Sequence, residues 1–222
     1  MNQLTKQPKY KFYATLLDAF TWYLKSEADE AFQGFLDKLN RVPFSSEAAD
    51  RGTAFNELVD SLITDTHNGN AWSESEIYNH NGFGFPADIV HEFVSLFFSA
   101  VPQVYVEKTI ETKYGPVLLY GYIDELMAYI ISDIKTTKNY EFGKYINNWQ
   151  HRVYLYCLKG TGIDTFQYTV TDFEEVYKEE YVWREEYELD LRLICEQLVM
   201  FITDHQHLIT DKKLFANEEI EA

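Results

Sequence analysis

Apolar residues recur every three or four positions through much of the N-terminal part of the chain. Between residues 9 and 40 this spacing occurs twice and predicts two helices. It predicts a further helix over 51–63, where RGTAFNELVDSLI has one apolar face, and another over 87–100. Residues 64–86 are rich in Asn, Gly, Ser and His, which is typical of an exposed loop. This part of the chain is therefore expected to be mainly helical.

The pattern changes after Val104, where β-branched and aromatic residues dominate as far as Thr136. A turn at 114–116 divides this segment, which predicts consecutive strands. The fold class is therefore α/β (α+β), a single domain over 1–222 with a central mixed sheet of about four strands flanked by helices. The expected elements are strands at about 103–113, 117–126 and 129–136, a helix at about 142–159, a strand at 163–171, a helix at about 183–207 and a frayed acidic tail after Lys213.

Composition supports a folded protein and restricts what it can bind. Of the 222 residues, 46% are apolar, enough for a sizeable core. Thirty-six Asp and Glu outnumber 19 Lys and Arg, giving a net charge of -17. This excess argues against a general polyanion-binding surface, because phosphate affinity comes largely from basic side chains. Any contact with nucleic acid would have to be local, through its own Lys and Arg or through bound metal ions.

Cysteine content and hydropathy bear on metal binding and on the cellular compartment of the protein. Cys157 and Cys195 are too few for a four-cysteine metal site and are expected to be buried free thiols. The N-terminal residues lack a signal-peptide core, and no apolar run approaches the roughly 18–20 residues that span a bilayer. The chain is predicted to be cytoplasmic and not to bind membranes.

The strand at 129–136 carries two charges in an otherwise apolar setting, YIISDIKTT. Asp133 and Lys135 are two residues apart and therefore project from the same face. A tight hairpin centred on Ala128–Tyr129 would place Asp124 directly opposite Asp133. Facing carboxylates are destabilising unless they reach solvent or share a cation. That cation could be Lys135 or a divalent metal, and carboxylate oxygens suit Mg²⁺.

The following helix contributes two more polar side chains. Gln150 and Tyr154 are four residues apart and share one helical face. Gln150 is either an ordinary surface amide or a hydrogen-bond partner for a metal-bound water or a phosphate oxygen.

Four segments, in order, resemble one superfamily. RGTAFNELVD, GYIDEL, SDIKTT and WQHRVYLY look like the motifs of PD-(D/E)XK nucleases, and within them the RecB-like exonuclease branch with its phage-type members. The likeness covers roughly residues 50–160, within a motif-bearing core at about 50–171. It implies a restriction-endonuclease-like core.

The resemblance assigns roles to residues on the second and third predicted strands. Asp124 matches the first metal-binding carboxylate and Asp133 the second, with the Ile134 carbonyl as a further ligand. Lys135 matches the motif lysine, which positions or activates water and offsets charge on the phosphate.

Two helices complete the resemblance, one of them with a departure. Gln150 and Tyr154 match the glutamine–tyrosine motif of the RecB branch. Asn56 stands where that branch usually presents a metal-binding His, and Glu57 is the residue expected to take over as ligand.

Together these features predict a DNA nuclease, an exonuclease in the first instance, that depends on Mg²⁺ or Mn²⁺. Its expected substrate is single- or double-stranded DNA ends in recombination, repair or phage replication, beside a helicase, recombinase or single-strand-binding partner. Bound cations with nearby Lys138, Lys144 and Arg152 would reverse the local potential. The alternative is a catalytically degenerate nuclease fold that binds DNA ends or a protein partner. A third hypothesis is an acidic protein that imitates the charge of DNA.

Overall fold

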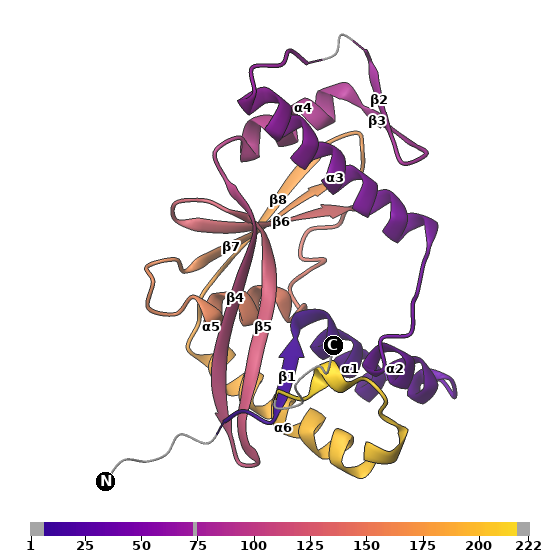
Figure 1. Ribbon diagram of the computed structural model, residues 1–222, viewed down its shortest axis with the longest axis vertical. Coiled ribbons are helices and arrows are strands. Elements are labelled where there is room, and N and C mark those ends of the chain that lie inside the picture. Colours follow the sequence, from indigo (N-terminus) through magenta and orange to yellow (C-terminus); the bar gives the residue numbers. More distant parts are fainter. Residues whose placement is uncertain (1–6, 73–74, 217–222) are drawn as a thin grey trace.

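A six-stranded mixed sheet organises the protein in the computed structural model, which describes residues 7–72 and 75–216 (Figure 1). The strand order is β1-β5-β6-β7-β8, and β4 pairs with the other edge of β5. Within this sheet of the described residues, the β1–β5 and β6–β7 pairs are parallel and the other pairs are antiparallel. The elements are β1 (Tyr10–Tyr13), α1 (Ala14–Lys25), α2 (Ala31–Leu39), α3 (Glu47–His67), β2 (Ile77–His80), β3 (Phe83–Pro86), α4 (Ala87–Phe97), β4 (Val101–Thr112), β5 (Gly115–Leu126), β6 (Ile130–Thr136), α5 (Gln150–Cys157), β7 (Thr165–Thr171), β8 (Val176–Val182) and α6 (Glu186–Asp204), with short 3₁₀ turns at Gln206–Leu208 and Lys212–Leu214.

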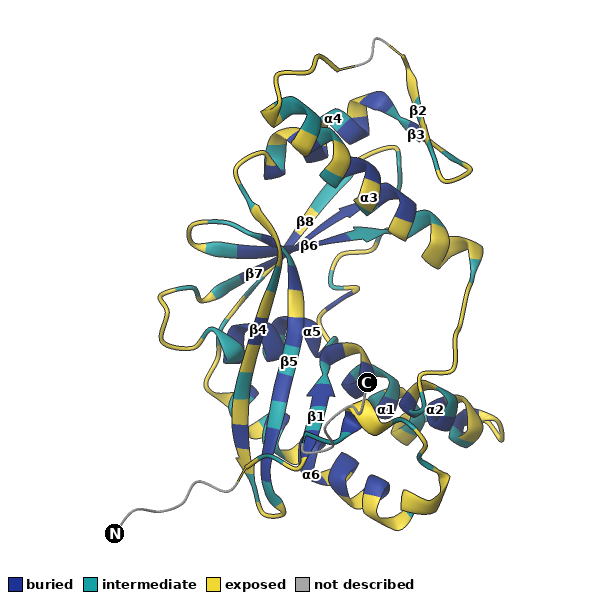
Figure 2. Ribbon diagram, in the orientation of Figure 1, coloured by how far each residue is buried: buried dark blue, intermediate teal, exposed yellow. Residues whose placement is uncertain are grey.

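Helices cover the sheet from both sides and form two hydrophobic cores. The larger core joins α1, α2, α5 and α6 to β1, β4, β5 and β7, and the smaller one lies beneath α3 and α4. Strand β6 contributes to both, because Ile131 belongs to the larger core and Ile134 to the smaller one. Figure 2 shows β6 and β7 largely in the dark blue of buried residues. Side chains of β6 are thus shielded from water on both faces.

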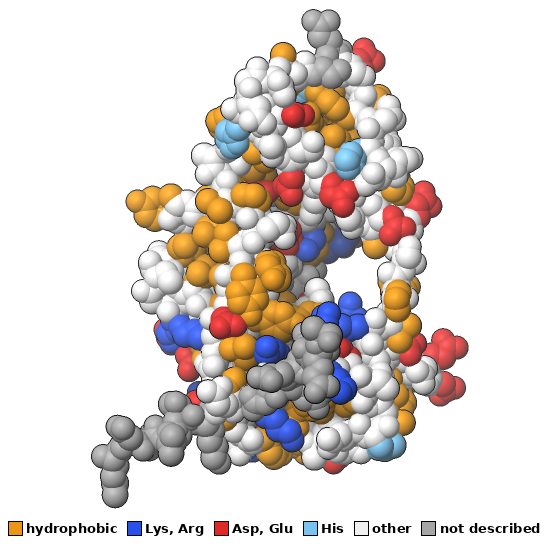
Figure 3. All heavy atoms as spheres, in the orientation of Figure 1, with side chains coloured by type: hydrophobic (Ala, Val, Ile, Leu, Met, Phe, Trp, Pro, Cys, Tyr) orange, Lys and Arg blue, Asp and Glu red, His pale blue; other side chains and the backbone are white. Residues whose placement is uncertain are grey.

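An opening separates the part of the molecule that carries α3 and α4 from the part that carries α1 and α2. It is bordered by α3, by the sheet, by α1 and α2, and by the linker between α2 and α3, residues 40–46 (Figure 1). Figure 3 shows that the opening persists with all side chains drawn, and that Lys and Arg side chains gather along one side of it. The linker is anchored at its start, where Asn40 donates to the Leu208 carbonyl at 2.9 Å and Arg41 pairs with Asp211 at 2.6 Å.

The main sheet has six strands where the sequence predicted four. The three expected consecutive strands are found as β4, β5 and β6, and the strand at 163–171 is found as β7. The additional strands are β1, inside the segment predicted as helix, and β8, which had no predicted element. Strand β1 is four residues long and runs directly into α1, so helical spacing masks it. Strand β8 is rich in Lys and Glu and lacks apolar alternation.

The predicted loop 64–86 was also wrong in part. It contains the end of α3 and a hairpin, β2–β3, closed by Asn81 and Gly82 with φ of 47° and 85°. Two central residues with positive φ are the mark of a type I′ turn, and Asn-Gly is its strongest sequence signal.

Three further predictions need correction. The helix expected at 142–159 spans only Gln150–Cys157, and the residues before it form turns. The tail after Lys213 is not frayed at its start, because Leu214 is buried and Phe215 bridges to Tyr10; residues 217–222 lie outside the described residues. Of the two free thiols, Cys195 is buried as predicted and Cys157 is only partly so. No helix in the described ranges is both long and apolar enough to cross a bilayer.

Candidate active site

The hairpin between β5 and β6 sets the geometry of the candidate site. Glu125 pairs with Ser132 across a two-residue turn at Ala128–Tyr129. One further step in the same register places Asp124 opposite Asp133. The predicted hairpin centre is therefore confirmed, even though its residues are poor formers of tight turns.

Strand β5 is irregular at the position of Asp124. Its ladder with β4 is continuous on either side but is interrupted at the pair Gln103–Asp124, and Gln103 has a left-handed φ of 55°. Ile123 and Leu126 both pack against the larger core although they are three residues apart, so the side-chain alternation breaks between them. Asp124 is thereby released from regular pairing with β4. Its Oδ2 instead accepts the backbone N–H of Ile134 on β6 at 3.4 Å.

Asp133 lies at the centre of a small polar group in the buried sheet. Its side chain is almost fully buried, and its residue exposure is 2%. One carboxylate oxygen accepts a hydrogen bond from Nε2 of Gln150, and the other forms an ion pair with the Lys135 ammonium. Lys135 also lies 6.0 Å from the ring centre of Tyr168, the residue that pairs with Asp133 on β7. The structure thus brings Asp133, Lys135 and Gln150 into direct contact.

Lys135 stays charged because acidic groups surround it. Burial by itself lowers the pKa of this amine, but Asp133, Asp124 and Asp18 together outweigh that effect and raise it. Asp18 on α1 was not identified from the sequence. Its carboxylate accepts the backbone N–H of Trp149, directly before α5, at 2.8 Å, and burial raises its pKa to about 6. An Asp on the apolar side of α1, next to buried Leu17, was the available signal.

The negative charge of Asp124 is disfavoured by its surroundings. Burial, followed by the nearby charge of Asp133, raises the pKa of Asp124 well above its usual range. A divalent cation between the two carboxylates would compensate both charges.

A second carboxyl pair lies next to the first. Glu125 is 2% exposed and shares a hydrogen bond with Asp60 of α3. Burial, then the charges of Asp60 and Asp124, raise the pKa of Glu125 to about 8. The pair fastens α3 to the end of β5, and sequence patterns gave no indication of it because the two residues lie far apart in the chain.

Tyr154 positions the helix that carries Gln150. Its ring lies against the backbone of Gly121, where an added Cβ would be 2.8 Å from the hydroxyl oxygen and 2.9 Å from Cζ. Tyr154 also shares a side-chain hydrogen bond with Gln150, while burial, Asp133 and Asp124 raise the pKa of its phenol. Tyr154 therefore holds the Gln150 side chain in place through their hydrogen bond, and Gly121 leaves room for the Tyr154 ring against β5.

Helix α3 presents one face to the candidate site. Gly52, Asn56 and Asp60 are spaced by four residues and lie on one side of the helix. Gly52 packs against Thr136, where an added Cβ would be 3.0 Å from Oγ1, and Asp60 meets Glu125. Asn56 lies between these contacts, and its Oδ1 is buried without a hydrogen-bond partner.

Glu57 does not join the carboxylates, contrary to the sequence prediction. Its side chain is 52% exposed and accepts a hydrogen bond from Asn81 at 2.6 Å, with His80 at 3.4 Å. One residue of helical rotation separates it from the face that Asn56 occupies. In the described parts of the chain, no three His, Cys, Asp or Glu side chains are grouped as a metal site.

The donor set nevertheless fits a hard divalent cation. Asp124 and Asp133 supply carboxylate oxygens, and the unpartnered Asn56 oxygen is a neutral donor on the adjoining helix face. The N–H of Ile134 points toward β5. In a β-strand the carbonyl of a residue points to the same edge as its N–H, so the Ile134 carbonyl also faces β5. Oxygen donors of this kind, completed by water, are what Mg²⁺ prefers.

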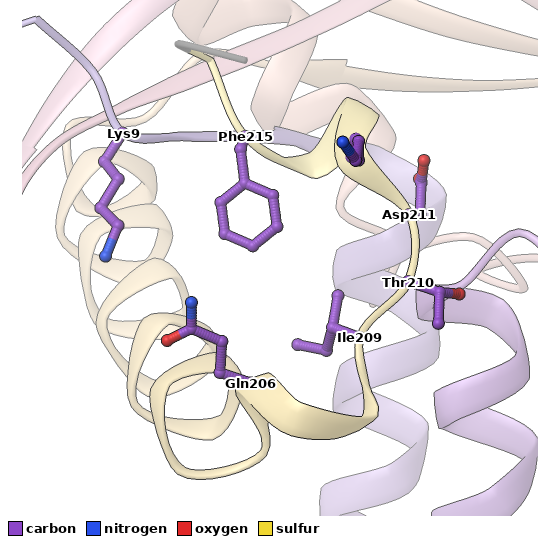
Figure 4. Close-up of a pocket in the computed structure, with 7 residues that line it drawn as sticks. Lys9, Gln206, Ile209, Thr210, Asp211 and Phe215 are labelled. Atoms are coloured by element: carbon purple, nitrogen blue, oxygen red, sulfur yellow. The ribbon is translucent and has the colours of Figure 1, made fainter.

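A cavity of about 680 Å³ lies elsewhere, between the start of β1 and the segment after α6. Lys9 and Gln206 approach it from opposite sides, and the ring of Phe215 lines it (Figure 4). It contains none of the candidate site residues. This cavity is therefore separate from the candidate site.

Two solved structures share the fold over most of the chain. SSO0001 aligns with a TM-score of 0.51 and 11% identity, covering 88% of this chain and 78% of its own. A "Putative exonuclease" from Eubacterium rectale aligns with a TM-score of 0.52 and 15% identity, covering 90% of this chain and 83% of its own. No protein-family profile and no curated protein sequence matches the chain. At these identities the likeness shows the fold alone.

Proposed function

We propose that the protein is a Mg²⁺- or Mn²⁺-dependent DNA nuclease of the PD-(D/E)XK kind, similar to the RecB-like exonucleases. The observation that carries the proposal is the convergence of Asp124, Asp133 and Lys135, joined by Gln150, on two buried strands. An apolar core does not retain such a group for stability, because replacing buried ion pairs by apolar residues is often neutral or stabilising. The fold shared with a "Putative exonuclease" supports it.

Each residue has a defined task in this proposal. Asp124, Asp133 and the Ile134 carbonyl would hold the metal ion, with the Asn56 oxygen beside them. When bound, the ion supplies Lewis acidity and a more acidic water for attack on phosphorus. Lys135 keeps its charge next to Asp133 and would hold the attacking water and offset charge on the phosphate oxygens.

Gln150 and Tyr154 act by positioning. The Gln150 amide donates to Asp133 and fixes the direction of the carboxylate. Tyr154 in turn fixes Gln150 through their hydrogen bond and its own contact with Gly121. Supporting contacts of this type hold catalytic groups in a narrow range of geometry.

The acidic surface is compatible with a DNA substrate because basic groups are concentrated locally. Lys and Arg side chains gather along one side of the opening in Figure 3, although the net charge is -17. Lys138 and Lys144 lie in the segment between β6 and α5. Arg152 forms an ion pair with Asp190 at 3.2 Å. DNA ends are therefore the proposed ligand, with a helicase, recombinase or single-strand-binding protein as the class of partner.

Digestion of end-labelled linear DNA, single- and double-stranded, with Mg²⁺ or Mn²⁺ tests the proposal. Wild type should release labelled products, and Asp133→Asn and Lys135→Gln should lose at least a hundredfold in rate, on the order of one general acid–base contribution. Glu180→Gln and Lys178→Gln on β8 remove the same charges from exposed positions and should remain active. Equal digestion by all five proteins would exclude the assigned site.

Asn56 favours the alternative, a nuclease fold that binds DNA ends or a protein partner without cleavage. Calorimetric titration with Mn²⁺ separates the two functions, since an intact site must bind metal in wild type and lose it in Asp133→Asn. A protein that binds DNA ends but neither Mn²⁺ nor cleaves would support the alternative.

A further inference from the structure

A second cavity, of about 320 Å³, lies beside the strand that carries Lys135. Its walls come from three elements: Arg51 on α3, residues 136–138 at the end of β6, and Phe173 in the turn between β7 and β8. Lys138 lies three residues after Lys135, just beyond the end of β6. The cavity adjoins the candidate site without sharing its residues.

Arg51 is held on an aromatic ring. Its guanidinium carbon lies 4.0 Å from the ring centre of Phe173, and that ring packs edge-on against Phe55 at 5.5 Å. Phe173 has a left-handed φ of 72°, which is costly for a residue with a side chain. Its N–H donates to Thr171 Oγ1 at 2.8 Å, which helps to hold this conformation. The turn thus fixes both the ring and the cation above it.

The basic groups of the cavity have no acidic partner. Within residues 7–72 and 75–216, neither Arg51 nor Lys138 forms an ion pair, although Asp and Glu outnumber Lys and Arg by 36 to 19. Lys144 adds a third cation nearby, since it donates to Thr137 Oγ1 at 2.5 Å. In a chain this acidic, two uncommitted cations facing one cavity indicate an anion from outside.

The carboxylate that lines the cavity, Asp172, already accepts hydrogen bonds from groups of the β7–β8 turn. Asp172 Oδ1 accepts the N–H groups of Glu174 and Glu175 at 3.0 and 2.9 Å, and its Oδ2 accepts the Tyr177 hydroxyl at 2.9 Å. These three hydrogen bonds satisfy the Asp172 carboxylate within the β7–β8 turn and its first strand residues.

We propose that this cavity binds a phosphodiester group of the DNA strand, on a nucleotide next to the one held at the candidate site. The inference rests on the proposed function and adds a substrate-positioning subsite to it. Arg51 presents a planar fork that suits two phosphate oxygens, and the Phe173 ring keeps the fork in place. Lys138 supplies a second, flexible charge. The subsite fixes the register of the strand relative to Asp133 and Lys135.

Fluorescence anisotropy with a fluorescein-labelled single-stranded oligonucleotide tests the subsite. EDTA is present throughout, so binding is measured without cleavage. Arg51→Gln should weaken binding about tenfold and lower the slope of log K against log salt concentration by about 0.7, the value for one phosphate contact. Arg51→Lys should fall between it and wild type, because Lys keeps the charge but not the fork. Arg184→Gln removes an exposed arginine just beyond the far end of β8 and should bind like wild type.

Thermal unfolding of each variant runs in parallel. If Arg51→Gln keeps its Tm and matches Arg184→Gln in affinity and salt slope, the subsite is refuted. If its Tm falls, Lys138→Gln decides, because Lys138 is exposed and carries no packing role; an unchanged salt slope there also refutes the subsite. The proposed function is judged separately. Digestion that needs Asp133 but not Arg51 rejects the subsite alone, whereas Arg51-dependent binding without digestion rejects the nuclease and keeps the subsite.

Discussion

Replacing Gly121 by Ala tests how closely α5 is seated on β5. An added Cβ would lie 2.8 Å from the Tyr154 hydroxyl oxygen and 2.9 Å from its Cζ, closer than real Cβ contacts. At a roomy strand position Ala is more stable than Gly by about 0.5–1 kcal/mol, so the clash must first cancel this gain. Overpacking costs roughly 1–3 kcal/mol, so the mid-range values of about 2 kcal/mol of cost and about 0.75 kcal/mol of gain leave a net loss of about 1.25 kcal/mol. At roughly 2–4 °C per kcal/mol for a chain of this size, Tm should fall by about 2.5–5 °C.

A double-mutant cycle with Tyr154→Leu shows whether the ring is the cause. In the Leu background the added methyl group meets no ring, so Gly121→Ala should leave Tm unchanged or raise it slightly. Scanning calorimetry of the four proteins gives the coupling energy directly. A Gly121→Ala protein as stable as wild type, or an equal loss in both backgrounds, would refute the packing argument. In the single variant Gly121→Ala, the displaced Tyr154 ring should also move Gln150 away from Asp133. Nuclease activity should therefore be reduced even at temperatures at which this variant is fully folded.

Three further predictions concern the charges of the site. Lys135→Met leaves Asp133 buried without its ammonium and should lower the free energy of unfolding by about 3 kcal/mol in urea titrations at neutral pH, and adding Asp133→Asn should recover most of it. The pKa of Asp18 is raised to about 6, so the folded protein binds a proton that the unfolded chain releases above about pH 4. Stability should therefore fall as pH rises from about 4 to 6, and Asp18→Asn, which keeps an acceptor for Trp149, should flatten the Tm–pH curve there; an unchanged curve contradicts this cause. Asn56→His should tighten Zn²⁺ binding relative to Mn²⁺ binding in calorimetry, since imidazole suits Zn²⁺ whereas carbonyl oxygens suit Mn²⁺, and an unchanged ratio of the two affinities would place Asn56 outside the coordination shell.

The sequence was sufficient for the β5–β6 hairpin and for the shared helical face of Gln150 and Tyr154, whereas the hydrogen bond from Gln150 to Asp133 was not predicted. Both depend on local spacing: the number of residues on either side of Ala128–Tyr129 sets the register, and helical periodicity places Gln150 and Tyr154 together. The Asn81–Gly82 hairpin could have been predicted from the same kind of signal and was missed because its surroundings are polar.

Other features depend on contacts that no local pattern encodes. The charged composition of β8 indicates an exposed segment, but the strand forms through its pairing with β7. Its buried Glu179 is stabilised by hydrogen bonds from the Gly143 N–H and the Tyr181 hydroxyl. Asp18 reaches Trp149 across the fold, far from it in the chain. Glu57 was wrongly expected at the site because a single helical position decides whether a side chain faces β6 or the β2–β3 hairpin.

The linker of residues 40–46 turns the gap beneath α3 into a closed ring, since α3 packs on β6 and the sheet continues to β1 and α1. Any polymer that lies within such a ring is topologically threaded and can arrive only by a free terminus. A covalently closed circular single strand would be refused unless the ring itself came apart, while a linear strand of the same sequence would be admitted.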